Sequence, residues 1–166
     1  FEITQERIDY ALSCLPIYEK YYHEIVEEIQ GLADGQQCDV RILQAVLFSM
    51  YSMPPSCNCS CFAFTTEQEI LLGRNSDFLT EIERLNQNVV YKLTDGVYSF
   101  TGNTTAFIEI EDGVNEHGLA VGLTSVYPNQ CKPGFNAGMI VRYLLEKCRN
   151  VSEAVSCLYQ LPIASA

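Results

Sequence analysis

The chain has 166 residues, of which 48% are hydrophobic, and this size and composition suit one globular domain with an apolar core. Its 10 basic and 21 acidic residues give a formal net charge of -11, so the average field of the protein repels the phosphates of nucleic acids and the headgroups of anionic membranes. No run approaches the ~20 apolar residues of a membrane span, and we expect neither nucleic acid nor a membrane as a partner.

The compartment is inferred from the amino-terminal segment and the cysteines. FEITQERIDY lacks the basic and then apolar pattern of a secretory signal peptide. Of the eight cysteines only Cys57, Cys59 and Cys61 are clustered, which differs from the even spacing of a small disulfide scaffold. We expect a cytoplasmic protein with mostly reduced thiols, although a chain that begins at Phe1 leaves secretion open.

The residues before Pro54 are predicted to be helical. Apolar residues recur at helical spacing from Ile8 to Leu32, and Pro16 is expected to restart or kink this helix because it lacks a backbone N–H. A second helix is predicted to begin after Asp39, a suitable N-cap, and to end at the two prolines of SMPPS.

After Pro55 the apolar pattern changes to a period of two. Residues 59–64 and 70–75 are predicted to be strands joined by the turn TTEQE, and Asp95-Gly96 is a hairpin signal. Two more strands are expected around a turn from Asp112 to Gly118, followed by helices in NAGMIVRYLLEKC and in VSEAVSCLYQL, with Ser152 as an N-cap. Helices, strands and helices without βαβ alternation indicate an α+β fold with an antiparallel sheet.

The stretch CNCSCFAF (57–64) is the first candidate for a functional site. On a strand its three thiols share one face and could chelate a soft metal, but no second pair of ligands follows at a matching distance. A metal or redox module is therefore one interpretation. Another is that Cys61, Cys148 and Cys157 are buried as small apolar residues.

A nucleophilic cysteine is the third interpretation. The predicted hairpin brings Arg74 and Asp77 of LLGRNSDF beside Cys59. A nearby cation favours the thiolate, which is the nucleophilic form of cysteine. The alternative is that Arg74 and Asp77 form an ordinary surface pair at the end of the hairpin.

Four segments of the chain resemble a known family: EEIQGLADG (27–35), CSCFAF (59–64), LLGRNSDF (71–78) and NEHGLAVGLT (115–124). They occur in the order seen in the N-terminal-nucleophile (Ntn) hydrolases, and the branch they resemble is that of the choloylglycine hydrolases and the acyl-coenzyme A:6-aminopenicillanate acyltransferases. The resemblance implies an αββα four-layer sandwich, made as a precursor that cuts itself immediately before the nucleophile.

Carried over to this chain, the resemblance places the cut between Asn58 and Cys59. Residues 1–58 would form a helical pro-segment or small subunit, and residues 59–166 the amino-terminal part of the catalytic domain. Cys59 would be the nucleophile, and its freed α-amine, with an ordinary pKa of ~7.7–8.0, would be the general base.

The resemblance also implies roles for three further residues. Asp77 would hold the α-amine, Arg74 would support the thiolate or the substrate, and Thr124 or a backbone N–H beside it would donate to the oxyanion. His117, in the NEHG turn, is not needed as a base and is expected to cap the turn or face solvent.

The chain departs from the family pattern in three places. Asn58 stands where glycine is common, Leu123-Thr124-Ser125 stands where relatives carry an oxyanion-hole asparagine, and the chain ends at Ala166, where relatives continue with further strands. We therefore expect an amino-terminal portion that associates with itself or with a missing carboxy-terminal half.

The sequence thus predicts a self-processing amidohydrolase or acyltransferase that works through a thioester on Cys59. Its substrate would be a small-molecule amide or acyl compound, with no cofactor and no metal. The alternatives are a non-catalytic relic that keeps the fold and binds an acyl or amide ligand, and the cysteine-rich metal or redox module.

Overall fold

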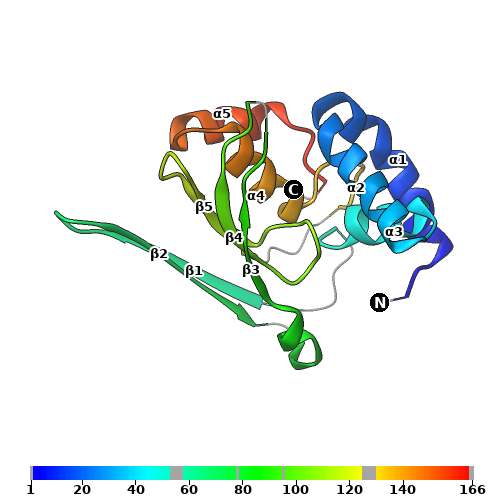
Figure 1. The fold of residues 1–166 in the computed structure, drawn as a ribbon, viewed down its shortest axis with the longest axis horizontal. Helices are drawn as coiled ribbons and strands as arrows, with labels where there is room; N and C mark the ends of the chain where they lie inside the picture. The colour runs from blue at the N-terminus through cyan, green and yellow to red at the C-terminus, as the bar shows by residue number, and fades with distance from the viewer. Residues whose placement is uncertain (1, 53–57, 78, 95, 125–129, 165–166) are drawn as a thin grey trace. The chain divides into compact units, whose positions relative to one another are not determined.

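The computed structural model describes residues 2–52, 58–77, 79–94, 96–124 and 130–164. The chain forms two compact units. One consists of Phe1–Pro54, Tyr127–Asn136 and Leu158–Ala166, and the other of Pro55–Val126 and Ala137–Cys157. The first unit is mainly helical, and the second contains the strands named in Figure 1.

The first unit contains α1 (Gln5–Tyr21), α2 (His23–Gln36) and α3 (Val40–Ser49). The Thr4 hydroxyl caps α1 by accepting a hydrogen bond from the Arg7 backbone N–H. The Asp39 carboxylate caps α3 by accepting from the Arg41 backbone N–H at 2.9 Å, which confirms the predicted N-cap.

An aromatic stack joins segments of this unit that are far apart in the sequence. The ring centroid of Tyr18 in α1 lies 4.1 Å from that of Phe48 in α3 and 4.5 Å from that of Phe135. All three side chains are fully buried. The Tyr18 hydroxyl accepts a hydrogen bond from the Asn136 backbone N–H, and the Asn136 side chain donates to the Leu47 carbonyl. The segment around Phe135 is therefore part of the helical core.

Pro16 does not restart the first helix, so this part of the prediction is wrong. α1 continues through Pro16 to Tyr21, and the break falls at Tyr22, whose φ of -152° and ψ of 56° are not helical. Cys14 and Tyr18, on either side of the proline, are completely buried. The packing of this face offsets the hydrogen bond that the proline removes.

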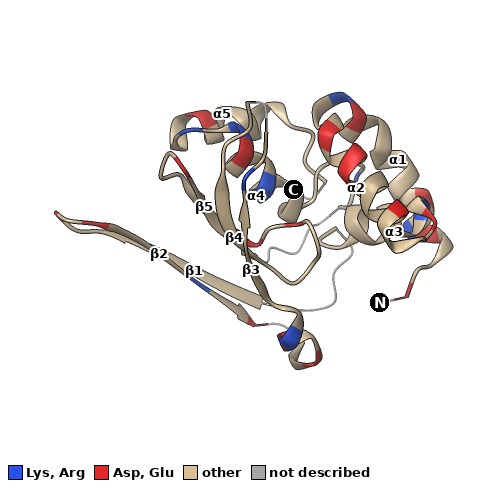
Figure 2. Ribbon diagram, viewed as in Figure 1, with Lys and Arg blue, Asp and Glu red and all other residues tan. Residues whose placement is uncertain are grey.

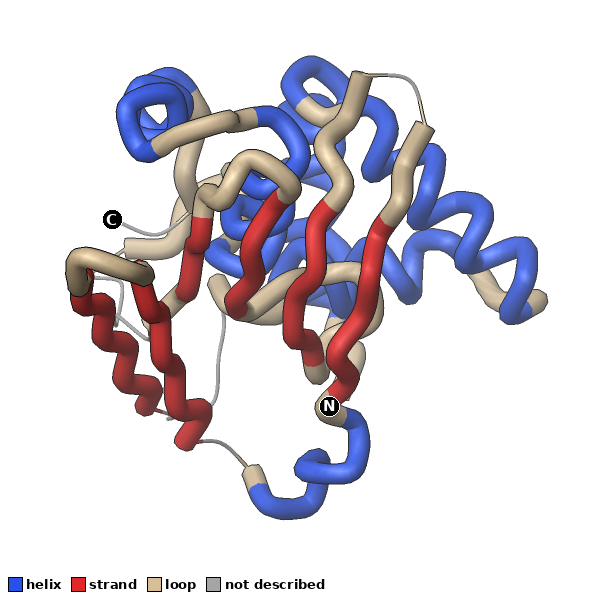
Figure 3. Tube along the Cα trace, turned by 60° about the vertical axis from the view of Figure 1, so that its left-hand side comes forward, coloured by secondary structure: helices blue, strands red, loops and turns tan. Residues whose placement is uncertain are grey.

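The strands that the structure describes in the second unit form two antiparallel sheets. β1 (Asn58–Thr65) and β2 (Ile70–Asp77) form a two-stranded hairpin, as the sequence predicts. The other four, β3 (Gln87–Tyr91), β4 (Phe100–Thr104), β5 (Asp112–Asn115) and β6 (Ala120–Gly122), lie side by side in sequence order. Figure 3 shows the hairpin as a separate pair of strands beside the four-stranded sheet.

The chain between β4 and β5 differs from the prediction. Residues 105–111 are not a strand, and Asp112 to Asn115, expected in a turn, form β5 instead. Phe107 has a φ of 58°, in the left-handed region, which interrupts an extended chain. Beyond it, the backbone N–H of Ile110 donates to the Gly138 carbonyl and that of Glu111 to the Asn103 carbonyl. The observed turn between β5 and β6 covers residues 116–119 and is therefore shorter than predicted. It includes Gly118, whose φ is 80°.

The β3–β4 hairpin pairs as predicted, but its strands stop farther from the turn, at Tyr91 and Phe100. Asp95 of the expected turn lies outside the described residues.

Two helices follow the sheet, α4 (Ala137–Lys147) and α5 (Val151–Gln160). α4 packs against β5 and β6, and a side chain at Gly113 of β5 would collide with Leu145 of α4. The Asn150 side chain caps α5 by accepting from the Glu153 backbone N–H at 3.0 Å. The prediction of Ser152 as the N-cap is wrong because Ser152 already lies inside the first turn of the helix.

These elements make the chain an α+β protein with helices and antiparallel sheet, as predicted. Among the described residues, no helix combines the length and the apolar character that a membrane span requires. Acidic residues recur along the helices, in keeping with the net charge of -11 (Figure 2).

Asn115, at the end of β5, connects the sheet to the end of α4. Its buried side chain donates to the carbonyls of Leu145 and Cys148, at 3.0 and 2.7 Å, and accepts from the backbone N–H groups of His117 and Leu119, both at 3.1 Å. One amide thus closes the turn before β6 and satisfies carbonyl groups at the carboxyl end of α4.

We predict that Asn115→Ala lowers the free energy of unfolding by ~2–4 kcal/mol, since it leaves several buried backbone groups without partners. Urea titration followed by circular dichroism measures this loss. Asn88→Ala is the control, because Asn88 makes its side-chain hydrogen bonds at the exposed surface of β3. Equal unfolding midpoints for the two variants would contradict the role of Asn115.

Candidate active site

The candidate site lies where β1 begins and β2 ends. In the register of this hairpin Asn58 pairs with Asp77, Cys59 with Ser76 and Cys61 with Arg74. Directly opposed residues point to the same face of a hairpin, and neighbours along a strand alternate. Cys59, Cys61, Arg74 and Ser76 therefore share one face, and Asn58 and Asp77 share the other.

The Arg74 side chain is the centre of the first face and is only 6% exposed. Its Nε donates to the Leu123 carbonyl at 2.8 Å, and its Nη1 donates to Glu111 Oε2 at 2.8 Å and lies 3.4 Å from Asp112 Oδ2. Its Nη2 donates to Cys59 Sγ at 3.2 Å. The planar guanidinium thus connects a thiol, two carboxylates and a backbone carbonyl.

The two carboxylates are themselves held by hydrogen bonds. The Glu111 side chain, also 6% exposed, accepts from the Thr105 hydroxyl at 2.5 Å, and the Ser76 hydroxyl lies 3.5 Å from Glu111 Oε2. Asp112 accepts from the Asn103 side chain at 2.6 Å. Buried charges with this many partners are fixed in position.

The charge of Arg74 is set by two opposing effects. Burial disfavours the guanidinium, but Glu111, Cys59 and Asp112 together outweigh this and hold the pKa of Arg74 above its usual value. Arg74 therefore remains cationic, and its Nη2 presents a positive charge to the sulfur of Cys59.

Asp77 is close to the nucleophile candidate along the backbone but lies on the opposite face. Its carboxylate accepts a hydrogen bond from the Asn75 side chain, and both residues are exposed. Its partner in the hairpin register is Asn58. The Asn58–Cys59 peptide bond thus runs alongside the backbone of Ser76 and Asp77.

Thr124 and His117 lie outside the hairpin. Thr124 is exposed. It directly follows Leu123 in the sequence, and the Leu123 carbonyl accepts a hydrogen bond from Arg74. His117 is exposed in the turn before β6, and its ring is nearly perpendicular to that of Tyr98, with 4.4 Å between the ring centroids. Its surface position in a turn is the one predicted from the sequence.

The remaining thiols differ in their surroundings. Cys61 is half-buried, and a side chain at Gly122 of β6 would come within 3.3 Å of its sulfur. Cys148 is buried as predicted, and its sulfur lies 3.4 Å from that of the half-buried Cys157. Burial and this neighbour raise the pKa of Cys148 to about 12.

No three His, Cys, Asp or Glu side chains are arranged to hold a metal ion in the described part of the chain. Cys57, which the metal interpretation requires, lies outside it.

Glu111 and Asp112 are the members of this cluster that sequence reasoning missed. Both stand in the alternating segment FIEIEDGV, where they read as exposed residues of a strand and its turn. The signal that could have identified them is the need of a buried arginine for carboxylate partners. Without the fold, however, nothing in the sequence paired them with Arg74.

Comparison with known proteins shows that a family model matches residues 64–166, which is more than half of the chain. The matched part includes Arg74, Asp77, Glu111 and Thr124, and Cys59 lies just before it. A search of curated proteins finds no match. The family model describes the acyl-coenzyme A:6-aminopenicillanic acid acyl-transferases.

We predict that Arg74→Lys lowers stability by ~1–3 kcal/mol although it keeps the positive charge. One ammonium group cannot reach a thiol, a carboxylate and a carbonyl that are arranged for a planar fork, so buried acceptors lose their donors. Urea titration measures the loss. Arg84→Lys, at an exposed arginine, is the matched control and should shift stability by less than ~0.5 kcal/mol.

Proposed function

The chain belongs to the acyl-coenzyme A:6-aminopenicillanic acid acyl-transferase family, and on this premise we propose that it is a self-processing Ntn enzyme that cleaves or transfers the acyl group of a linear amide through a thioester on Cys59. The proposal includes the four-layer αββα sandwich of such enzymes. Family membership supports acyl transfer or amide hydrolysis as the class of reaction. The choice of Cys59 rests on the geometry of the hairpin.

The contact between Arg74 and Cys59 is the observation that carries the proposal. The buried Arg74 is held by Leu123 through Nε and by Glu111 through Nη1, and its third nitrogen, Nη2, donates to the sulfur at 3.2 Å. Such a donor stabilises negative charge on sulfur and keeps the thiol in one orientation. Cys61, in contrast, packs against Gly122, which favours Cys59 as the nucleophile.

Self-cleavage would supply the base for the reaction. While the Asn58–Cys59 peptide bond is intact, the nitrogen of Cys59 is an amide and cannot accept a proton. Cleavage frees an α-amine with an ordinary pKa of ~7.7–8.0, which suits a general base near neutral pH. Asp77, paired with Asn58 in the hairpin, would orient this amine.

The proposed reaction has two steps. The α-amine takes the thiol proton, the sulfur attacks the amide carbon, and the C–N bond breaks as the α-ammonium returns a proton to the leaving amine. Water, or a second amine in a transferase, then attacks the thioester and releases the thiol. The Thr124 hydroxyl or a backbone N–H beside it would donate to the oxyanion of each tetrahedral intermediate.

Residues 1–58 would remain bound after cleavage. In the helical unit Tyr18 and Phe48 stack with each other, and Tyr18 stacks on Phe135, which belongs to the other side of the cut. Separating the two pieces would expose these buried rings to water. We therefore propose that the segment before Cys59 becomes a small subunit of the mature enzyme.

We predict that Cys59→Ala stays a single chain, whereas Cys61→Ala and Cys57→Ala are cut. Intact-mass and amino-terminal analysis of freshly made protein detects a new terminus at Cys59, and gel filtration should show the two pieces eluting together. Normal processing of Cys59→Ala would refute the assignment. A wild-type chain that is never cut would favour the non-catalytic relic.

We predict further that Asp77→Asn folds but reacts ~10²–10⁴ times more slowly with an amide substrate, because a neutral amide cannot hold the ammonium form of the α-amine with a charge-assisted hydrogen bond. Single-turnover thioester formation on processed protein measures this rate. Glu69→Gln, at the turn end of the same hairpin, should react as the wild type does. An unchanged rate for Asp77→Asn would remove Asp77 from the mechanism.

A further inference from the structure

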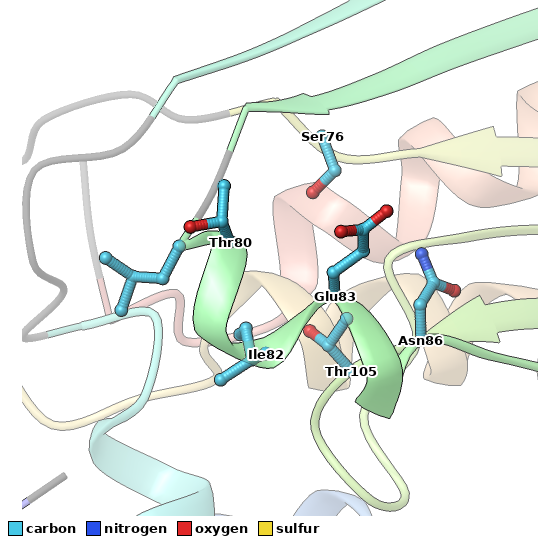
Figure 4. A pocket seen from close by; sticks show the side chains of 7 residues that line it. Ser76, Thr80, Ile82, Glu83, Asn86 and Thr105 are labelled. Carbon is cyan, nitrogen blue, oxygen red and sulfur yellow. The ribbon is translucent and has the colours of Figure 1, made fainter.

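A pocket of about 300 Å³ opens beside the reactive cluster, at the lower end of the size range of small-molecule sites. It is formed by the end of β2, by the short 3₁₀-helix η1 (Thr80–Leu85) with its flanking residues, and by Thr105. Figure 4 shows the Glu83 carboxylate reaching from η1 toward Ser76 of β2.

Two structural relations place the pocket close to Cys59. Ser76, which lines it, is the residue directly opposite Cys59 in the hairpin. Ser76 and Thr105 both lie within hydrogen-bond distance of Glu111, which holds Arg74 against the sulfur. A ligand in the pocket is therefore close to the proposed nucleophile.

The hydrogen-bonding capacity of the wall identifies the chemistry of this ligand. The Thr105 hydroxyl donates to Glu111 at 2.5 Å and the Ser76 hydroxyl lies 3.5 Å from the same carboxylate, so both oxygens can offer lone pairs to a ligand in the pocket. The Glu83 carboxylate accepts hydrogen bonds and carries a negative charge. Thr80 and Asn86 can donate as well as accept hydrogen bonds, but none of the described lining residues is basic, and the charge of Glu83 disfavours an anion.

Among the described lining residues Leu79 and Ile82 are apolar and suit a hydrocarbon part of the ligand. A primary ammonium group offers three donors and a positive charge, which match the acceptors and the charge of the wall. We propose that this pocket is the subsite for an organic ammonium group carried by the amide substrate, with Glu83 as the recognition residue. The assignment of the ligand as substrate rests on the proposed function.

Binding of small probes tests this inference directly. Glycinanilide carries an ammonium group and an amide, acetanilide is the same amide without the ammonium group, and benzylamine is a free amine. Calorimetric titration of the full chain at pH 6.5 and low salt should show binding of glycinanilide and weaker binding of benzylamine. Acetanilide should bind at least tenfold more weakly than glycinanilide.

Variants locate the site. Glu83→Gln should weaken glycinanilide binding about tenfold, or ~1.4 kcal/mol, and Glu81→Gln, on the same short helix but outside the pocket lining, should leave it unchanged. Asn86→Asp should tighten binding, because it adds a carboxylate to the wall, and a gain of affinity cannot result from misfolding.

The inference is overturned if acetanilide binds as well as glycinanilide, if glycinanilide does not bind, or if Glu83→Gln leaves its affinity unchanged. Tighter binding of benzylamine than of glycinanilide would assign the pocket to a free amine and overturn its role as a substrate subsite. None of these outcomes depends on processing at Cys59. Failure of the pocket and failure of the proposed enzyme are therefore separate results.

Discussion

The arrangement of the candidate site depends on the burial of one guanidinium. A buried arginine without partners is strongly destabilising, so the fold must bring acceptors to every edge of Arg74. Leu123, Glu111 and Asp112 supply them from the region of β5 and β6, while Cys59 receives the remaining contact from β1. The same hydrogen bonds that satisfy this charge attach the hairpin to the four-stranded sheet and orient the sulfur.

Glu111 links this constraint to the pocket beside it. Its carboxylate is shared by Arg74 and two hydroxyls, and those hydroxyls line the pocket. The need to satisfy one buried carboxylate therefore decides which hydrogen-bonding groups the pocket presents to a ligand. In the proposed enzyme, the reactivity of Cys59 and the preference for a ligand would therefore be coupled through Glu111.

The helical unit holds the amino-terminal segment together with later parts of the chain. Its core is completed by residues from beyond the strands, where Phe135 packs against Tyr18 and Asn136 bonds to Tyr18 and Leu47. The parallel bridge between Phe135 and Ile163 adds the carboxy-terminal segment to the same unit. Three separate stretches of sequence therefore stabilise one another, and a cut in the chain between them would not release any of them.

Local signals in the sequence were sufficient for several elements. The alternation in CSCFAF, the polar turn after it and the Asp39 cap depend on neighbouring residues only, and the hairpin and α3 form as they predict. The hairpin register follows from the same signals. Side chains alternate between the two faces and the turn is short, so only a few registers of the two strands are possible. Arg74 could thus be placed near Cys59 before any fold was known.

Tertiary structure decided the rest. α1 continues through Pro16 because the packing of its buried face outweighs one missing hydrogen bond. Residues 105–111 leave the extended conformation because Phe107 has a positive φ and the backbone N–H of Ile110 donates to the carbonyl of Gly138 in α4. The carboxylates of Glu111 and Asp112, which alternation assigns to a strand and a turn, face a charge 37 and 38 residues away. Short-range patterns specify how a segment folds locally, but the partner of a buried charge depends on which distant segments pack together.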